Sequence, residues 1–137
     1  MTLPRLLAIA AAMILSLAPL RAEEPAETIQ SVISDQIDAF QRSDLPAAFA
    51  HASPSIQSIF GSPERFGQMV RGGYPMIWRP SRFEMLKLLP GPGLQVQTVL
   101  FEAQDGSLYE ADYEMIEIDG VWRINGVALR KLPGVAS

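Results

Sequence analysis

Cysteine is absent from this chain of 137 residues, and histidine occurs once, at position 51. Without cysteine no disulfide can form, so the fold has to be stabilised by packing alone. Zinc sites built from cysteine are excluded, and a single histidine cannot complete a histidine-rich one. The chain also lacks a glycine-rich phosphate loop and a Gly-x-Ser-x-Gly nucleophile motif. We therefore expect neither a metal ion nor another cofactor.

Positive charge is scarce as well. The chain carries 11 basic and 15 acidic residues, for a net charge of −4. Two of the basic residues, Arg5 and Arg21, precede position 23, so the remainder is more acidic still. Nucleic acids and anionic membrane surfaces are bound through clustered lysine and arginine. We therefore expect neither as a partner of the mature protein.

The only long apolar run lies at the N-terminus. Arg5 precedes a stretch from Leu6 to Leu20 that only Ser16 and Pro19 interrupt. A positive start, an apolar stretch and a small residue before a polar boundary are typical of a secretory signal peptide. A membrane-spanning helix needs about 20 apolar residues, more than this run supplies.

We therefore expect residues 1–22 to be a cleaved signal peptide and residues 23–137 to form a single α+β domain. The domain would be exported and would be periplasmic or secreted after cleavage. Ala22 suits the last position of the signal, whereas Leu20 occupies a position where a small residue is usual. An uncleaved membrane anchor is the alternative.

The first half of the domain predicts helices. Residues 27–42 show the 3.6-residue period of an amphipathic helix, with Ile33 and Phe40 among its apolar side chains. Three short helices should follow, because Asp44, Ser53 and Ser62 are good capping residues. Proline follows Ser53 and Ser62 at the first helical position, where its missing N–H costs nothing.

Glycine and proline predict where these helices end. Gly61 and the pair Gly72-Gly73 should end the last two, because glycine adopts the left-handed conformation easily. Residues 74–80 should be extended, because Pro75 and Pro80 restrict the residue before each of them.

The second half predicts a four-stranded antiparallel meander, with strands near 81–89, 95–103, 108–118 and 121–130. Asp105-Gly106 and Asp119-Gly120 are typical of two-residue hairpin turns. A turn of this type at each site places Tyr113 opposite Gly126 and fixes which side chains share a face. The face toward the helices would then carry Val96, Thr98, Leu100, Tyr113, Met115, Trp122 and Ile124. The outer face would carry Val99 and Phe101, with Asp112, Glu114, Arg123 and Asn125.

Two stretches resemble known families. The stretch Asp119-Gly120-Val121-Trp122-Arg123-Ile124 is similar to the last strand of many members of the nuclear transport factor 2-like superfamily. The central residues resemble an uncharacterised family, the domain of unknown function 4864. They are Ala39-Phe40, Asp44, Ala48-Phe49, Ala52-Ser53-Pro54, Ile56, Phe60, Phe66, Met69-Val70 and Tyr74. The resemblance covers about residues 28–130 and implies a cone of helices packed on a curved sheet, but no reaction.

The superfamily implies a pocket between the helices and the concave face of the sheet. We expect the pocket to be lined by Tyr74, Trp78, Thr98, Tyr113 and Trp122. Plain core packing is the alternative for Tyr113 and Trp122, because a buried Tyr or Trp usually needs only a partner for its polar atom.

Other chemistry-bearing residues are expected to be structural. His51 should lie in the last turn of a short helix, where a polar group interacts with exposed carbonyls. Glu110, Asp112 and Glu114 alternate along one strand and could hold Ca²⁺, but residues so spaced lie about 6.5–7 Å apart. We expect these three carboxylates to lie on a solvated face of the sheet.

Trp78, Arg79 and Arg82 form a small cluster of an aromatic ring and two cations. The cluster could contact an acidic ligand, although packing at the edge of the sheet is the expected alternative.

An apolar patch on the outer face predicts a contact with another protein. Val99, Phe101, Ile116 and Val127 would lie there among charged side chains. A homodimer or a partner protein could cover this patch.

Our leading interpretation is an exported, non-catalytic module that binds a small apolar ligand or a protein partner. The alternative is a small pocket enzyme of the isomerase, dehydratase or hydrolase type, with His51, Glu102 or Glu117 as the base. A structural component of the cell envelope is a third possibility. A carboxylate or histidine inside the cavity would favour the enzyme.

Overall fold

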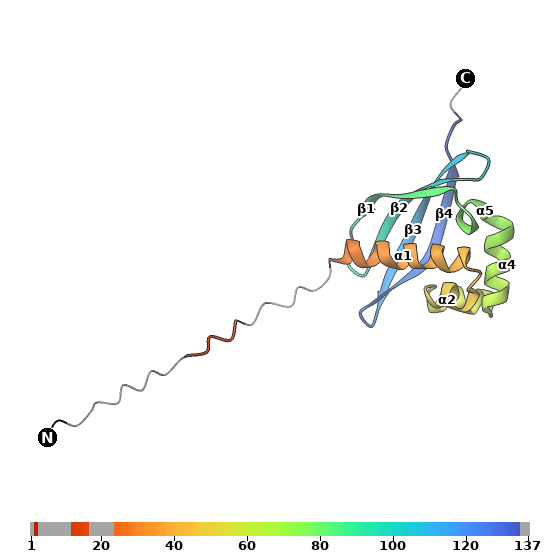
Figure 1. The fold of residues 1–137 in the computed structure, drawn as a ribbon. Coiled ribbons are helices and arrows are strands. Elements are labelled where there is room, and N and C mark those ends of the chain that lie inside the picture. The colour runs from red at the N-terminus through yellow and green to blue at the C-terminus, as the bar shows by residue number, and fades with distance from the viewer. Residues whose placement is uncertain (1, 3–11, 17–23, 135–137) are drawn as a thin grey trace.

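Five helices precede four strands in the computed structural model, which describes residue 2, residues 12–16 and residues 24–134 (Figure 1). The predicted signal peptide lies mostly outside the described residues. Within the described ranges, no helix is both long and apolar enough to cross a membrane. The helices are α1 (Pro25–Gln41), α2 (Leu45–Ala50), α3 (Pro54–Phe60), α4 (Pro63–Gly73) and α5 (Pro75–Trp78). The strands are β1 (Arg82–Leu89), β2 (Leu94–Glu102), β3 (Leu108–Ile118) and β4 (Val121–Lys131).

The three short helices begin at the predicted capping residues. Asp44, Ser53 and Ser62 each accept a hydrogen bond from the backbone N–H three residues on, at 3.2 Å in every case. Gly61 ends α3 in the left-handed conformation, with a φ of 78°. The helix starts and this glycine stop are therefore confirmed.

The segment from Gly72 to Pro80 differs from the prediction. Gly72 and Gly73 belong to α4, and residues 75–78 form the one-turn helix α5 instead of an extended segment. Tyr74 and Arg79, which precede the two prolines, depart from helical geometry, with φ values of −134° and −144°. Proline restricts the residue before it but suits the first turn of a helix, so Pro75 ends α4 and starts α5.

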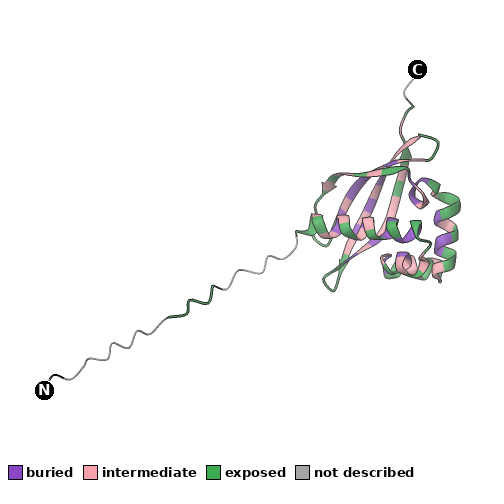
Figure 2. Ribbon diagram, viewed as in Figure 1, coloured by how far each residue is buried: buried purple, intermediate pink, exposed green. Residues whose placement is uncertain are grey.

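The helices cover one face of the sheet (Figure 1). The strands pair antiparallel in the order β1-β2-β3-β4, and α1 lies across them. Its apolar stripe is fully buried, as predicted from its 3.6-residue period: Ile29, Ile33, Ile37 and Phe40 are at most 1% exposed. Figure 2 shows this burial concentrated between α1 and the sheet. The core is therefore a single layer between the helices and the sheet.

The hairpin of β3 and β4 has the predicted turn. Asp119 and Gly120 both have positive φ, at 51° and 77°, and Ile118 pairs with Val121. The predicted pairing holds as far as Met115 with Ile124. A β-bulge then shifts the register between Glu114 and Met115, so Tyr113 pairs with Val127 and not with Gly126.

The hairpin of β2 and β3 corrects the predicted faces. Only Gly106 has a positive φ there, and Glu102 pairs with Leu108, so five residues connect the strands. The predicted two-residue turn would instead pair Ala103 with Leu108. This difference of one residue moves every side chain of β2 to the opposite face. Val99 and Phe101 are therefore 0% exposed inside the core, whereas Val96, Thr98 and Leu100 belong to the outer face.

Charged and polar side chains are paired on the outer face. Arg130 donates hydrogen bonds to Glu110 and Asp112, and Thr98 Oγ1 donates to Asp112 Oδ1 at 2.8 Å. Asn125 Nδ2 donates to Glu114 Oε1 at 3.1 Å. Glu110, Asp112 and Glu114 thus accept hydrogen bonds that link neighbouring strands of the sheet. In the described part of the chain, no group of three or more acidic or histidine side chains could hold a metal ion.

Acid should weaken this outer-face network through Asp112. Hydrogen bonds from Arg130, and also from Thr98, hold the pKa of Asp112 below its ordinary value. The resulting stability is complete above the unfolded pKa of about 3.9 and is lost as the pH falls through the folded pKa. We expect Asp112→Asn to flatten the acid side of a plot of unfolding free energy against pH. Equal acid-side slopes for Asp112→Asn and the wild-type protein would contradict this role.

Candidate ligand pocket

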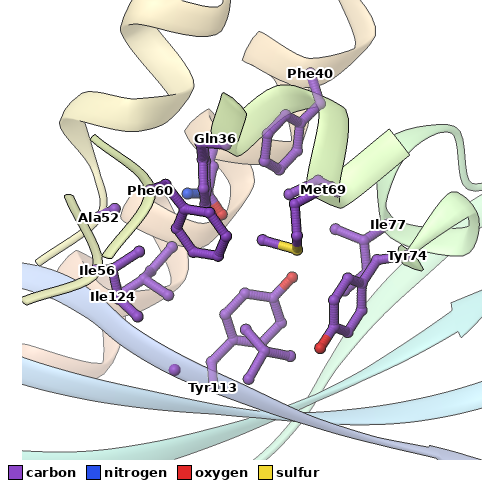
Figure 3. A pocket seen from close by; sticks show the side chains of 14 residues that line it. Gln36, Phe40, Ala52, Ile56, Phe60, Met69, Tyr74, Ile77, Tyr113 and Ile124 are labelled. Atoms are coloured by element: carbon purple, nitrogen blue, oxygen red, sulfur yellow. The ribbon is translucent and has the colours of Figure 1, made fainter. Parts of the chain in front are cut away.

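A cavity of about 280 Å³ lies between the helices and the sheet (Figure 3). Its wall comes from α1, α3, α4, α5 and the links beside them on one side, and from β3 and β4 on the other. The described lining residues are Gln36, Phe40, Ala52, Ile56, Phe60, Phe66, Met69, Val70, Tyr74, Ile77, Tyr113, Ile124, Gly126 and Val127.

The described part of the wall is uncharged. None of the described lining residues is Asp, Glu, His, Lys or Arg. The polar side chains among them are those of Gln36, Tyr74 and Tyr113. Gln36 is 3% exposed, and its Nε2 donates to the carbonyl of Ala48 at 3.1 Å. An ionised ligand would find no counter-charge here, so the cavity suits an uncharged one.

Aromatic packing shapes the helical side of the cavity. The ring of Phe66 contacts those of Phe40, Phe49 and Phe60, with centroid distances of 5.9, 5.5 and 5.7 Å. Contacts at this spacing stabilise a wall beyond the apolar area that they bury. Ile56, Phe60, Met69 and Tyr74 are only partly buried, which places the mouth of the cavity beside α3 and α4.

Tyr113 is the unusual residue of the wall. Its side chain is 0% exposed, and its hydroxyl has no hydrogen-bond partner in the structure. In Figure 3 the hydroxyl points away from the sheet and into the cavity. Burial raises the pKa of Tyr113 above its ordinary value, so the hydroxyl stays protonated at neutral pH.

The unpaired hydroxyl should lower the stability of the ligand-free protein. A buried polar group without a partner costs about 1–3 kcal/mol. We expect Tyr113→Phe to raise the free energy of unfolding by about 1 kcal/mol in urea titrations of the ligand-free protein. Tyr74→Phe, which removes the hydroxyl of a partly exposed ring, should change it little. A loss of stability in Tyr113→Phe would show that the hydroxyl is satisfied.

Two of the five predicted pocket residues line the cavity, namely Tyr74 and Tyr113. Thr98 lies on the outer face because of the shifted register of β2. Trp78 is turned toward the ring of Phe40, at 5.5 Å between centroids, and the guanidinium of Arg79 covers it at 5.2 Å. Trp122 is buried on the inner face, nearer to the β3–β4 turn than the lining residue Ile124.

Three of the four residues predicted for an outer interface do not lie on that face. Val99 and Phe101 belong to the core, and Val127 lines the cavity opposite Tyr113. The shifted turn moves Val99 and Phe101, and the bulge in β4 moves Val127. Ile116 alone keeps its predicted place, opposite Arg123 on the outer face. The apolar patch that motivated a homodimer is therefore not formed.

The candidate bases lie away from the cavity. His51 caps the C-terminal end of α2, as predicted, and burial together with nearby Arg123 lowers its pKa, although Asp35 opposes this shift. Glu102 is paired with Arg82 at 2.6 Å, and Glu117 is exposed near the β3–β4 turn. None of the three is a lining residue.

Most of the helical wall was not predicted from the sequence. Gln36 lies on the buried apolar stripe of α1, and a glutamine at such a position is itself a signal of a polar site. Ile56, Phe60 and Met69 lie on the apolar sides of their helices, where sequence does not separate a cavity wall from ordinary core.

The helices, the meander and the cavity between them define an α+β cone of the NTF-2-like class. Three crystal structures of NTF-2-like proteins of unknown function share this fold. The protein from Silicibacter pomeroyi is 15% identical, with a TM-score of 0.56 over 78% of this chain and 95% of that one. The protein from Shewanella baltica is 9% identical, with a TM-score of 0.53 over 80% and 94%. The protein from Burkholderia xenovorans is 14% identical, with a TM-score of 0.51 over 82% and 88%.

The chain belongs to the family of the domain of unknown function 4864 (DUF4864), whose model matches residues 22–137. No curated protein matches the chain. The structural similarities are at low identity and establish the fold alone. Any argument about function therefore has to start from the cavity itself.

Proposed function

We propose that this domain is an exported binding module that encloses a small, uncharged, largely apolar molecule in the cavity between α1, α3, α4 and the sheet. The observation that carries the proposal is the cavity of about 280 Å³, whose described lining residues include no charged side chain. Small-molecule sites are typically concave and mostly apolar, with a few polar groups that fix orientation. Gln36 and Tyr113 supply such groups here.

The size of the cavity limits the ligand. An engineered apolar cavity of about 150 Å³ binds benzene. A cavity of about 280 Å³ is nearly twice as large, so it suits a molecule of roughly ten to twelve non-hydrogen atoms. Fused bicyclic compounds have this size.

Binding is favoured over proton-transfer catalysis because of what the wall contains. A proton-abstracting enzyme needs a base within hydrogen-bond reach of its substrate. His51, Glu102 and Glu117 lie away from the wall, so the described lining offers no such base. Export remains part of the proposal and rests on the signal-like pattern of residues 1–22.

Titration with tetralin, a neutral bicyclic hydrocarbon, tests the proposal. We expect amide chemical shifts to change around the cavity, at residues such as Gln36, Met69 and Tyr113. The amides of the outer-face residues Glu84 and Leu100, whose sequence neighbours do not line the cavity, should not respond. Shift changes confined to the outer face, or none up to the solubility limit of tetralin, would contradict the proposed function.

A further inference from the structure

The hydroxyl of Tyr113 is a hydrogen-bond donor without an acceptor at the base of the cavity. It is carried by β3 and enclosed on all sides, and its side chain is 0% exposed. Most buried polar groups in proteins have a partner, so an unpaired one calls for a physical reason. A ligand that brings an acceptor into the cavity would supply the partner.

We propose that the ligand carries a carbonyl oxygen that accepts a hydrogen bond from Tyr113, which orients the molecule in the cavity. This inference rests on the proposed function and specifies the chemistry of its ligand. The expected ligand is therefore an uncharged ketone, aldehyde or ester of about the size of a fused bicyclic compound.

The surroundings of Tyr113 favour a carbonyl over other groups. A carboxylate would enter a wall without a described cation, which makes its desolvation costly. A carbonyl accepts a hydrogen bond and brings no donor of its own that would need a second partner. Because burial keeps Tyr113 protonated, the bond should persist across neutral pH.

Met69 is a flexible lining residue on the helical side of the cavity. In Figure 3 the thioether of Met69 and the hydroxyl of Tyr113 point toward one another across the cavity. The hydroxyl makes no hydrogen bond with it. Methionine is unbranched, with three rotatable bonds, so a ligand can displace it at small cost. Met69 lies on partly exposed helix α4, which leaves space for this movement.

A matched pair of probes tests this inference. Tetralin and 1-tetralone share a bicyclic skeleton and differ chiefly in the carbonyl group. We would measure the affinities of both by calorimetry in the wild-type protein, in Tyr113→Phe and in Tyr74→Phe. Comparing this affinity ratio between two proteins cancels the difference in hydration between the probes, because the free probes are the same in every titration.

We expect the affinity ratio of 1-tetralone to tetralin to fall about tenfold in Tyr113→Phe, because one hydrogen bond inside a dry cavity is lost. In Tyr74→Phe, the ratio should stay within about twofold of the wild-type value. Tyr113→Phe is isosteric apart from the hydroxyl, so it is expected to fold.

The possible failures are distinguishable. If both probes bind the cavity with an unchanged ratio in Tyr113→Phe, this inference is wrong and the proposed function stands. If the ratio falls in Tyr74→Phe instead, the carbonyl is oriented by the other tyrosine and the inference is also wrong. If neither probe binds the wild-type protein, the proposed function itself fails.

Discussion

Phe101→Lys is expected to unfold the domain, whereas Leu100→Lys, one residue away, is expected to be tolerated. Phe101 is 0% exposed and contacts the rings of Phe83 and Tyr113, at 6.1 and 6.3 Å between centroids. Losing the ring and burying an ammonium group should cost at least about 5 kcal/mol, comparable with the whole stability of a small domain. Circular dichroism during thermal unfolding should show no cooperative transition for this variant.

Leu100 is the matched control because it lies on the outer face of the same strand. It is half-buried and pairs with Glu84 on β1 and with Glu110 on β3, so a lysine there meets two carboxylates. We expect a change in unfolding free energy of no more than about 1 kcal/mol. The opposite result, with Leu100→Lys unfolded and Phe101→Lys folded, would mean that β2 and β3 pair through a two-residue turn after all.

Val127→Phe is expected to weaken the binding of tetralin about tenfold or more without unfolding the protein. Val127 lines the cavity and pairs across the sheet with Tyr113. A larger ring at this position occupies space that the ligand needs, and crowding of this kind costs roughly 1–3 kcal/mol. The cavity and the partial exposure of Val127 leave room for the ring, so the fold should persist. Calorimetric titration measures the affinity.

Ala128→Phe is the control for this variant. Ala128 follows Val127 in β4 but is exposed on the outer face, opposite Asp112. We expect the tetralin affinity of Ala128→Phe to match that of the wild-type protein within about twofold. Equal losses in both variants would show that the added ring acts through the strand and not by filling the cavity.

Local signals determined much of the fold. The capping residues Asp44, Ser53 and Ser62 start their helices through side-chain hydrogen bonds that depend on a few neighbouring residues. The positive φ values of Asp119 and Gly120 likewise follow from the turn that this dipeptide favours. Such features could be predicted because their energies are set within one turn of chain.

Register could not be predicted in the same way. A dipeptide such as Asp105-Gly106 fits both a two-residue turn and the five-residue connection seen here, and the choice depends on which side chains of β2 the helices bury. The core takes Val99 and Phe101 in preference to Thr98 and Leu100, since this buries the larger apolar area. The bulge beside Glu114 is a further tertiary feature, with no marker in the sequence that separates it from regular strand.

The candidate site was predicted in part for the same reason. Tyr113 was assigned to the correct face because the bulge places its extra residue in β4 and leaves the alternation of side chains along β3 unbroken from the confirmed turn. The absence of a hydrogen-bond partner for its hydroxyl depends on packing against α4 and could not be read from sequence. Thr98 was assigned to the pocket only through the wrong turn.

A crystal structure of the protein with 1-tetralone tests the central claim most directly. We predict density for the ligand between α1, α3, α4 and the sheet, with Met69 displaced and the carbonyl oxygen about 2.7–2.8 Å from the hydroxyl oxygen of Tyr113. Density on the outer face of the sheet, or an unchanged cavity in crystals saturated with the ketone, would contradict the account.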